Sequence, residues 1–323
     1  DGNAAELDGL QATGTNSTQA LTITVDDAVT AAQGALIAAA TNSATVDFSA
    51  AGVSDAFGSL VDGDGTTSDD FDATVAKDGD INVNVTDTIA DASAQNVTDL
   101  NALMNATTGT VTATIDGNAA ELDGLQATGT NSTQALTITV DDAQTGAAGV
   151  TALNIVAAAT TGTVTATISG NGAELDDLTV SGTTATQAYT ITVDDAVTAA
   201  QGALIVASTN AATVDFSAAG VSDAFGNLVD GDGTTSDDFD ATVAKDGDIN
   251  VSVTGAIADA SAQDVTDLNA LMNATTGTVT ATIDGNAAEL DGLQATGTSS
   301  STQALTITVD DAVTAAQGAL IVA

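Results

Sequence analysis

The residues best suited to chemistry lie in one acidic segment, VDGDGTTSDDFD at 61–72, which recurs at 229–240. Its Asp-Gly-Asp-Gly run places several carboxylates on flexible links, so that their oxygens can surround a hard cation such as calcium. The segment departs from an EF-hand loop because Thr67 stands where the turn glycine should be and no Glu closes the loop. We predict either a calcium site or a solvated acidic loop. The expected ligands are Asp62, Asp64, Asp69 and Asp70, with Asp230, Asp232, Asp237 and Asp238 in the second copy.

A second set of oxygen-bearing side chains directly follows the strand-like segments of the chain. These residues are Asp26, Ser49, Thr86, Asp116, Asp141, Ser169, Asp194, Ser217, Thr254, Asp284 and Asp310. A short polar side chain at this position can cap the helix or turn that follows it. The alternative is a ladder of calcium sites built on the same column.

Enzymatic chemistry is not expected. The sequence has no His and no Cys, and its only basic side chains are Lys77 and Lys245. Ser–His–Asp and Cys–His sites therefore cannot be built, nor can zinc sites of the Cys/His type. A carboxylate pair remains chemically available, but the acidic residues recur with the repeats, whereas a catalytic pair would need residues that occur once.

The formal net charge of −42 limits the possible partners. Nucleic acids and anionic membranes are excluded because no basic patch exists to bind them. No apolar run reaches membrane-spanning length, so we expect no membrane insertion. The chain should repel itself in low salt and be shielded in a saline or calcium-rich medium.

The sequence is nearly two copies of a 168-residue unit, at 1–168 and 169–323, the second incomplete. AVTAAQGALI at 28–37 returns at 196–205, and the acidic segment returns at the same offset. The registers differ by one residue near the end, where SSST at 299–302 replaces NST at 131–133. Neither terminus carries an evident end cap, so we expect a window of a longer array.

The first 168-residue repeat contains six strand-like segments and the incomplete second repeat contains five, all with apolar residues at alternate positions, as in half-buried strands. We call each strand-like segment with its helical connection a coil. Successive segments are 23–30 residues apart, except across a long acidic coil of 37 residues, which occurs at 49–85 and again at 217–253. The eleven segments are 21–25, 44–48, 81–85, 111–115, 136–140, 164–168, 189–193, 212–216, 249–253, 279–283 and 305–309. Helical patterns such as VTDLNALM at 97–104 lie between them, and we expect Gly109, Gly162 and Gly277 to end helices in a left-handed conformation.

Strands alternating with helices at this period indicate an α/β solenoid. We expect one continuous solenoid over 1–323, with stacked strand–helix coils, one long parallel sheet and helices on its apolar face. All six Phe lie in or beside the long coil and should give it a small core. The alternative fold is a string of tandem all-β sandwich domains.

Thr-x-Thr pairs recur on the outward face of the strands. They are Thr22/Thr24, Thr112/Thr114, Thr137/Thr139, Thr165/Thr167, Thr190/Thr192, Thr280/Thr282 and Thr306/Thr308. Stacked strands would align them in a flat grid of hydroxyl and methyl groups about 4.8 Å apart. Such a face suits a glycan or ice surface, or lateral packing, although Thr is also common on exposed strands.

The runs VTDLNALMNATTGTVTATIDGNAAEL and ALTITVDDAVTAAQGAL resemble tandem repeats of giant cell-surface or secreted, adhesin-like proteins of marine bacteria, notably cyanobacteria. The resemblance implies an extracellular or cell-surface location. We therefore expect a non-catalytic structural repeat region of a filament, adhesin stalk or surface layer, which associates with itself along or beside the solenoid. The alternative is a glycan- or ice-binding module that uses the Thr-x-Thr face.

Overall fold

The computed structural model describes residues 1–14, 18–48, 52–211, 213–216, 220–295, 297 and 299–321, which form two compact units. Unit 1 comprises residues 1–143, 151–166 and 181–188, and unit 2 comprises 144–150, 167–180 and 189–323. Helix α7 (Gly146–Ala158) and strands β7 (Thr163–Gly170) and β8 (Thr186–Val193) have residues in both units.

Unit 1 combines short helices with a parallel sheet. Its helices are α1 (Ala4–Leu7), α2 (Ala31–Ala39), α3 (Phe57–Leu60), α4 (Asp69–Val75), α5 (Ala94–Ala106) and α6 (Ala119–Leu122). Its strands are β1 (Val53–Asp55), β2 (Val83–Ile89), β3 (Thr110–Gly117), β4 (Thr133–Gln134) and β5 (Thr137–Val140). Strands β1, β2, β3 and β5 pair side by side in this order, and β4 also pairs with β3.

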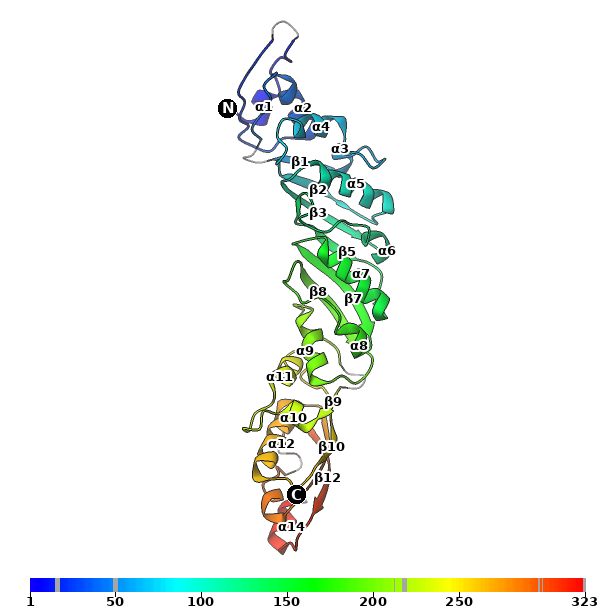
Figure 1. The fold of residues 1–323 in the computed structure, drawn as a ribbon, viewed down its shortest axis with the longest axis vertical. Coiled ribbons are helices and arrows are strands. Elements are labelled where there is room, and N and C mark those ends of the chain that lie inside the picture. The colour runs from blue at the N-terminus through cyan, green and yellow to red at the C-terminus, as the bar shows by residue number, and fades with distance from the viewer. Residues whose placement is uncertain are drawn as a thin grey trace. The chain divides into compact units, whose positions relative to one another are not determined.

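Unit 2 repeats much of this arrangement. Its helices are α8 (Gly172–Leu175), α9 (Ala199–Ala207), α10 (Phe225–Leu228), α11 (Asp237–Val243), α12 (Ala262–Ala274), α13 (Ala287–Leu290) and α14 (Ala315–Ile321). Its strands are β6 (Gln144–Thr145), β9 (Val221–Ala224), β10 (Val251–Ile257), β11 (Thr278–Gly285) and β12 (Thr302–Val309). Strands β9 to β12 form a four-stranded parallel sheet, and Figure 1 shows α12 along one side of it.

The α/β class is confirmed because every pairing between named strands is parallel, which the sandwich alternative does not allow. The expected alternation is also present: in β3, Val111, Ala113 and Ile115 are buried while Thr112 and Thr114 are exposed. Parallel strands covered by helices bury one apolar face in this way. The core beneath β3 includes the fully buried α5 residues Leu100, Leu103 and Met104.

The expectation of one sheet with a strand at all eleven segments is wrong, because the described strands form two sheets. Segments 21–25 and 44–48 form only isolated β-bridges, Gly2↔Val25 and Thr24↔Asp47. The described part of segment 212–216 forms one, Thr192↔Asp215. Gly52 (φ 70°) and Gly220 (φ 71°) stand immediately before β1 and β9. An added Cβ at either glycine would overlap the backbone carbonyl of Asn82 or Asn250. Strands β1 and β9, which begin directly after these glycines, were not predicted.

The role expected for Gly109, Gly162 and Gly277 is also wrong. None of the three has a positive φ. A Cβ at each would instead overlap a backbone carbonyl oxygen of an earlier coil, at Ile81, Leu136 and Ile249 respectively. These glycines are therefore needed where the chain passes close to its neighbouring coil, as the start of each strand requires.

Buried threonines join successive coils beside these glycines. The Thr160 hydroxyl donates to Leu136 O at 2.7 Å and accepts from the amides of Leu136 (2.7 Å) and Gly162 (2.8 Å). The same bridge from a threonine to the preceding coil occurs at Thr41, Thr107, Thr209 and Thr275. Each hydroxyl satisfies backbone groups that would otherwise be buried without a partner.

The long acidic coil has a core of its own, as expected from its aromatic residues. Phe48, Phe71, Phe216 and Phe239 are at most 1% exposed, whereas Phe225 is half-buried. The two lysines lie in this coil. Lys77 Nζ donates to Ser43 O at 2.6 Å, and Lys245 Nζ donates to Ala211 O, so both stabilise carbonyls just beyond a helix.

Candidate metal centres

The carboxylates predicted as calcium ligands are all exposed. Asp64 accepts a hydrogen bond from Thr66 Oγ1 at 2.6 Å. Ser68 caps α4 and thereby places Asp69 and Asp70 in the first helical turn, where negative charge stabilises the helix. The second copy has the same arrangement at Asp232 and at Asp237 and Asp238. Within the described residues, the acidic groups close enough to share an ion lie elsewhere, so the structure does not gather the predicted ligands.

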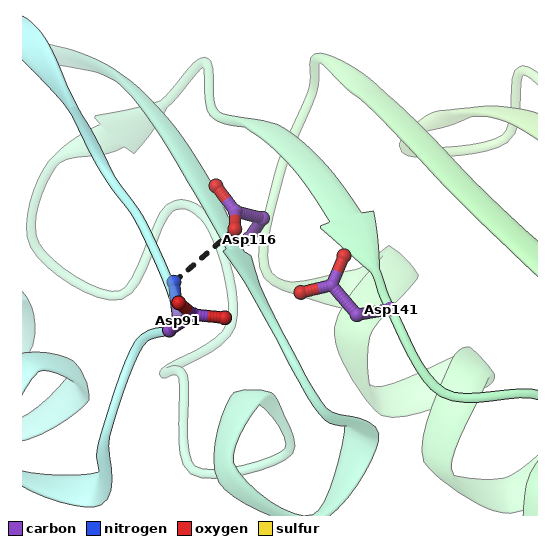
Figure 2. Close-up of side chains that lie close together, drawn as sticks. All are labelled: Asp91, Asp116 and Asp141. Carbon is purple, nitrogen blue, oxygen red and sulfur yellow. Dashed lines mark hydrogen bonds between the residues drawn. The ribbon is translucent and has the colours of Figure 1, made fainter.

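In unit 1, three carboxylates meet at one edge of the sheet: Asp91, Asp116 and Asp141 (Figure 2). Asp91 follows β2, Asp116 lies near the end of β3, and Asp141 directly follows β5. One carboxylate oxygen of each lies within 4.8 Å of the others. The Asp91 amide also donates to Asp116 Oδ2 at 3.1 Å. Neighbouring parallel strands thus bring together residues that are 25 positions apart in sequence.

Unit 2 contains the same cluster at Asp259, Asp284 and Asp310, again within 4.8 Å. The Asp259 amide donates to Asp284 Oδ2 at 3.3 Å. The cluster forms although the inserted residue at 299–302 shifts Asp310 by one position. The pairing of the strands is kept despite the insertion, since Thr278 pairs with Thr302 as Thr110 pairs with Thr133. The two units therefore build the same site independently.

Asp91 and Asp259 hold the left-handed conformation, with φ of 47° and 49°. They are the only non-glycine residues with positive φ in the described part of the chain. Asp tolerates this conformation better than most side chains. In the resulting turn, the Asp91 amide points at Asp116, and the Asp91 carboxylate lies beside the carboxylates of Asp116 and Asp141.

The carboxylates of the first cluster repel one another electrostatically. Desolvation raises the pKa of Asp141, and the negative charges of Asp116, Asp91 and Asp142 raise it further. The cluster opens onto a hollow lined by Gly117, Asn118 and Glu121, and its own side chains are exposed or half-buried. Either a proton or a cation in this hollow would reduce the repulsion.

The chemistry that this set of carboxylates favours is the binding of a hard cation. Calcium takes six to eight oxygen ligands, so three carboxylates would supply part of a shell completed by water or neighbouring oxygens. Asp116, Asp141, Asp284 and Asp310 belong to the column that sequence reasoning singled out. Asp91 and Asp259 were missed; the available signal was an Asp in a tight turn before the helix-capping Ser93 or Ser261.

The column does not cap the helices that follow it, contrary to expectation. The local caps are Asn3, Asn118 and Asn171 for the short helices and Thr30 or Ser93 for the longer ones. Ser49 and Ser217 of the column lie outside the described residues. Capping by Asp does occur, but across coils, and in most cases the Asp stands one position after the column residue.

This inter-coil cap recurs in both units of the described chain. Asp142 Oδ1 accepts from the amide of Ala119, the first residue of α6, at 2.8 Å. Equivalent contacts join Asp27 to Ala4, Asp55 to Ala31, Asp87 to Phe57, Asp195 to Gly172, Asp223 to Ala199 and Asp311 to Ala287. Each carboxylate lies 23–30 residues after the helix that it caps.

The Thr-x-Thr face is aligned within each sheet. Thr114 pairs with Thr137 and Thr282 pairs with Thr306 in register. Elsewhere the rows change character, since Asp116 pairs with Thr139 and Asn84 Nδ2 donates to Ser54 Oγ at 3.0 Å. The exposed face is thus a polar surface with short threonine rows.

Comparison with known proteins gives no match to any family model, curated protein or solved structure. Over the part of the chain that the structure describes, no helix has both the length and the apolar character needed to cross a bilayer.

Proposed function

We propose that this chain is a non-catalytic structural repeat region of an extracellular filament, adhesin stalk or surface layer, with its strand–helix coils stacked as one solenoid. The observation that carries the proposal is the inter-coil contact set. The Asp cap at helix N-termini and the Thr bridge at strand starts recur in both units. Contacts that join each coil to its neighbour are the basis of stability in repeat proteins.

The chemistry of the side chains supports a structural role. The acidic clusters are duplicated, and the sequence provides neither His nor Cys, so Ser–His–Asp and Cys–His sites cannot be built. The net charge of −42 suits a protein that works in a salt-rich medium outside the cell. The resemblance to giant surface proteins of marine bacteria supports the same location.

Imaging of native surface material tests the structural role. Antibodies raised against the chain should label intact cells, and electron micrographs should show the label on filaments or a surface layer. Protease treatment of intact cells should remove the label. Labelling that appears only after cell lysis would contradict the proposal.

A glycan- or ice-binding module is the second candidate, and the in-register threonine rows favour it. Side chains such as Thr114 and Thr137 present hydroxyl and methyl groups at strand spacing, which suits a flat, repetitive ligand. Ice-recrystallisation and glycan-array assays test this candidate. Thr112→Lys combined with Thr114→Lys should abolish binding, whereas loss of Asp62, distant in sequence from these strands, should not change it.

A further inference from the structure

The C-terminal coil of unit 2 carries a helix that occurs three times in the chain. AAQGALI forms α2, α9 and α14, and each is capped by a Thr–Gln pair at Thr30, Thr198 or Thr314. The three helices therefore share their sequence and local structure. They differ in what covers them.

The first two copies are covered by the long acidic coil. Helix α2 contacts α4, and α9 contacts α11. At each contact a glycine faces a fully buried threonine, Gly34 against Thr74 and Gly202 against Thr242. An added Cβ at Gly34 or Gly202 would overlap that threonine hydroxyl. The glycine thus leaves the space in which the DDFDATV helix of the acidic coil packs.

Two further contacts complete this interface. Asp55 Oδ2 accepts from the Ala31 amide at 3.0 Å, and Asp223 Oδ2 accepts from Ala199 at 3.1 Å. The preceding valine also forms a bridge to the first residue of the VSD strand, Val29↔Val53 and Val197↔Val221. Val29 and Val197 are both 0% exposed as a result.

The same positions are open in the third copy. Val313 is 49% exposed and Ala315 is exposed. At Gly318, the nearest atom to an added Cβ is Val313 Cγ2, at 3.8 Å. The inward residues of β12, Leu305, Ile307 and Val309, are half-buried, whereas Tyr189, Ile191 and Val193 of β8 are buried.

The exposure is specific to the interface. Leu320 is 54% exposed, and its counterparts Leu36 and Leu204 are 55% and 48% exposed although their helices are covered. Helix α14 therefore differs from α2 and α9 on the face that meets the acidic coil and not on the opposite face.

We propose that the face formed by Val313, Ala315, Gly318 and the inward residues of β12 is a docking surface for a coil of the long acidic type, with the sequence of residues 208–257. Gly318 receives the threonine of its DDFDATV helix, and the aspartate of its VSD strand caps α14 at Ala315. The order of coils is thus specified by a glycine–threonine pair between helices. The inference rests on the proposed function, because it describes how coils stack.

A second copy of the present chain, docked by its N-terminus, does not fit this surface. Residues 1–14 are the counterpart of 116–129. In unit 1 that coil packs on the coil of α5, since α5 contacts α6 and an added Cβ at Gly124 would lie 3.2 Å from Val97 Cγ1. It offers neither the DDFDATV helix nor the VSD strand.

The test extends the chain by one acidic coil. A copy of residues 208–257 is joined after Ala323, and hydrogen exchange is measured at the amides of Val313, Ala315 and Gly318. Docking should slow their exchange at least tenfold relative to the unextended chain. Gly318→Val should abolish this protection in the extended chain and leave the midpoint of the unextended chain nearly unchanged. Leu320→Ala, on the opposite face, should have the same small effect in both.

Unchanged exchange on extension would overturn the proposal, as would protection that survives Gly318→Val. A dimer of the unextended chain that Gly318→Val dissociates would also overturn it, because a second copy would then be the occupant. Each result is independent of the imaging test: surface filaments without docking would leave the structural role standing, and docking without filaments would remove that role alone.

Discussion

Asp142 accepts a hydrogen bond from the backbone amide of Ala119, which belongs to a coil 23 residues earlier in the sequence. Helix α6 thus has two caps, Asn118 from its own coil and Asp142 from the next. Inter-coil caps of this kind give seven aspartates of the described chain a structural role.

Removal of this cap should destabilise the protein. Asp142→Ala is expected to lower the free energy of unfolding by about 1 kcal/mol, the usual cost of losing an N-terminal cap. Asp142→Asn keeps an acceptor oxygen and should lose less. Chemical denaturation in calcium-free buffer measures both, with Asp62→Ala as a control that removes an equal charge. A loss no greater than that of the control would contradict the capping role.

Asp141, which precedes Asp142, should destabilise the folded protein when it is charged. Because the pKa of Asp141 is raised in the folded state, the native protein holds this proton more tightly than the unfolded chain does. The charged form therefore destabilises the fold at neutral pH, and the penalty disappears as pH falls below the ordinary carboxyl range. Asp141→Asn should raise the unfolding midpoint at pH 7 and leave it unchanged near pH 3. Asp62→Asn is the charge-matched control, and equal shifts for both variants would refute the prediction.

The buried threonines that bridge two coils should contribute more to the stability of the fold than exposed threonines do. Thr160→Val preserves shape but leaves Leu136 O and two amides without their partner, at a cost of about 1–3 kcal/mol. Thr165→Val, on the exposed face of β7, should change stability by less than about 0.5 kcal/mol. Thermal unfolding of the two variants compares them directly. Similar midpoints would show that the bridge contributes little.

Calcium binding is tested by thermal unfolding in calcium and in chelator at matched ionic strength. The midpoint is expected to rise with calcium, because a ligand that binds only the folded state stabilises it by about 2.7 kcal/mol at a hundredfold excess over its Kd. Asp116→Asn with Asp284→Asn should remove the rise if the clusters bind the ion. Asp62→Asn with Asp230→Asn should remove it if the acidic loop does. An unchanged wild-type midpoint would leave charge screening as the only effect of the salt.

Sequence patterns predicted the parallel α/β class because alternation in segments such as VTATI at 111–115 and the 168-residue repeat are strong, regular signals. They failed at 44–48, where alternation is just as clear. There the Val46 amide donates to Lys77 O and the Phe48 amide donates to Asp78 Oδ2, through a close approach of segments that are distant in sequence. Local patterns carry no information on such approaches.

The candidate site was predicted in part. Asp116 and Asp141 lie at fixed positions after strands, so periodicity revealed them. Asp91 enters through a left-handed turn after β2, whose register with β3 shifts, so it stands outside the column of residues that directly follow the strand-like segments. The calcium site expected in the loop at 61–72 stays a prediction, and helix α4 holds two of its expected ligands, Asp69 and Asp70, in its first turn.

The residue inserted at 299–302 leaves strand register and acidic cluster intact, and this has a genetic consequence. Length changes in that loop are neutral for the fold, while the repeated coils offer nearly identical stretches of coding DNA. Unequal recombination between such stretches can add or delete whole coils. We expect related strains to differ in the number of coils, because in this chain AVTAAQGALI at 312–321 already stands where the first repeat has AQTGAAGV at 143–150.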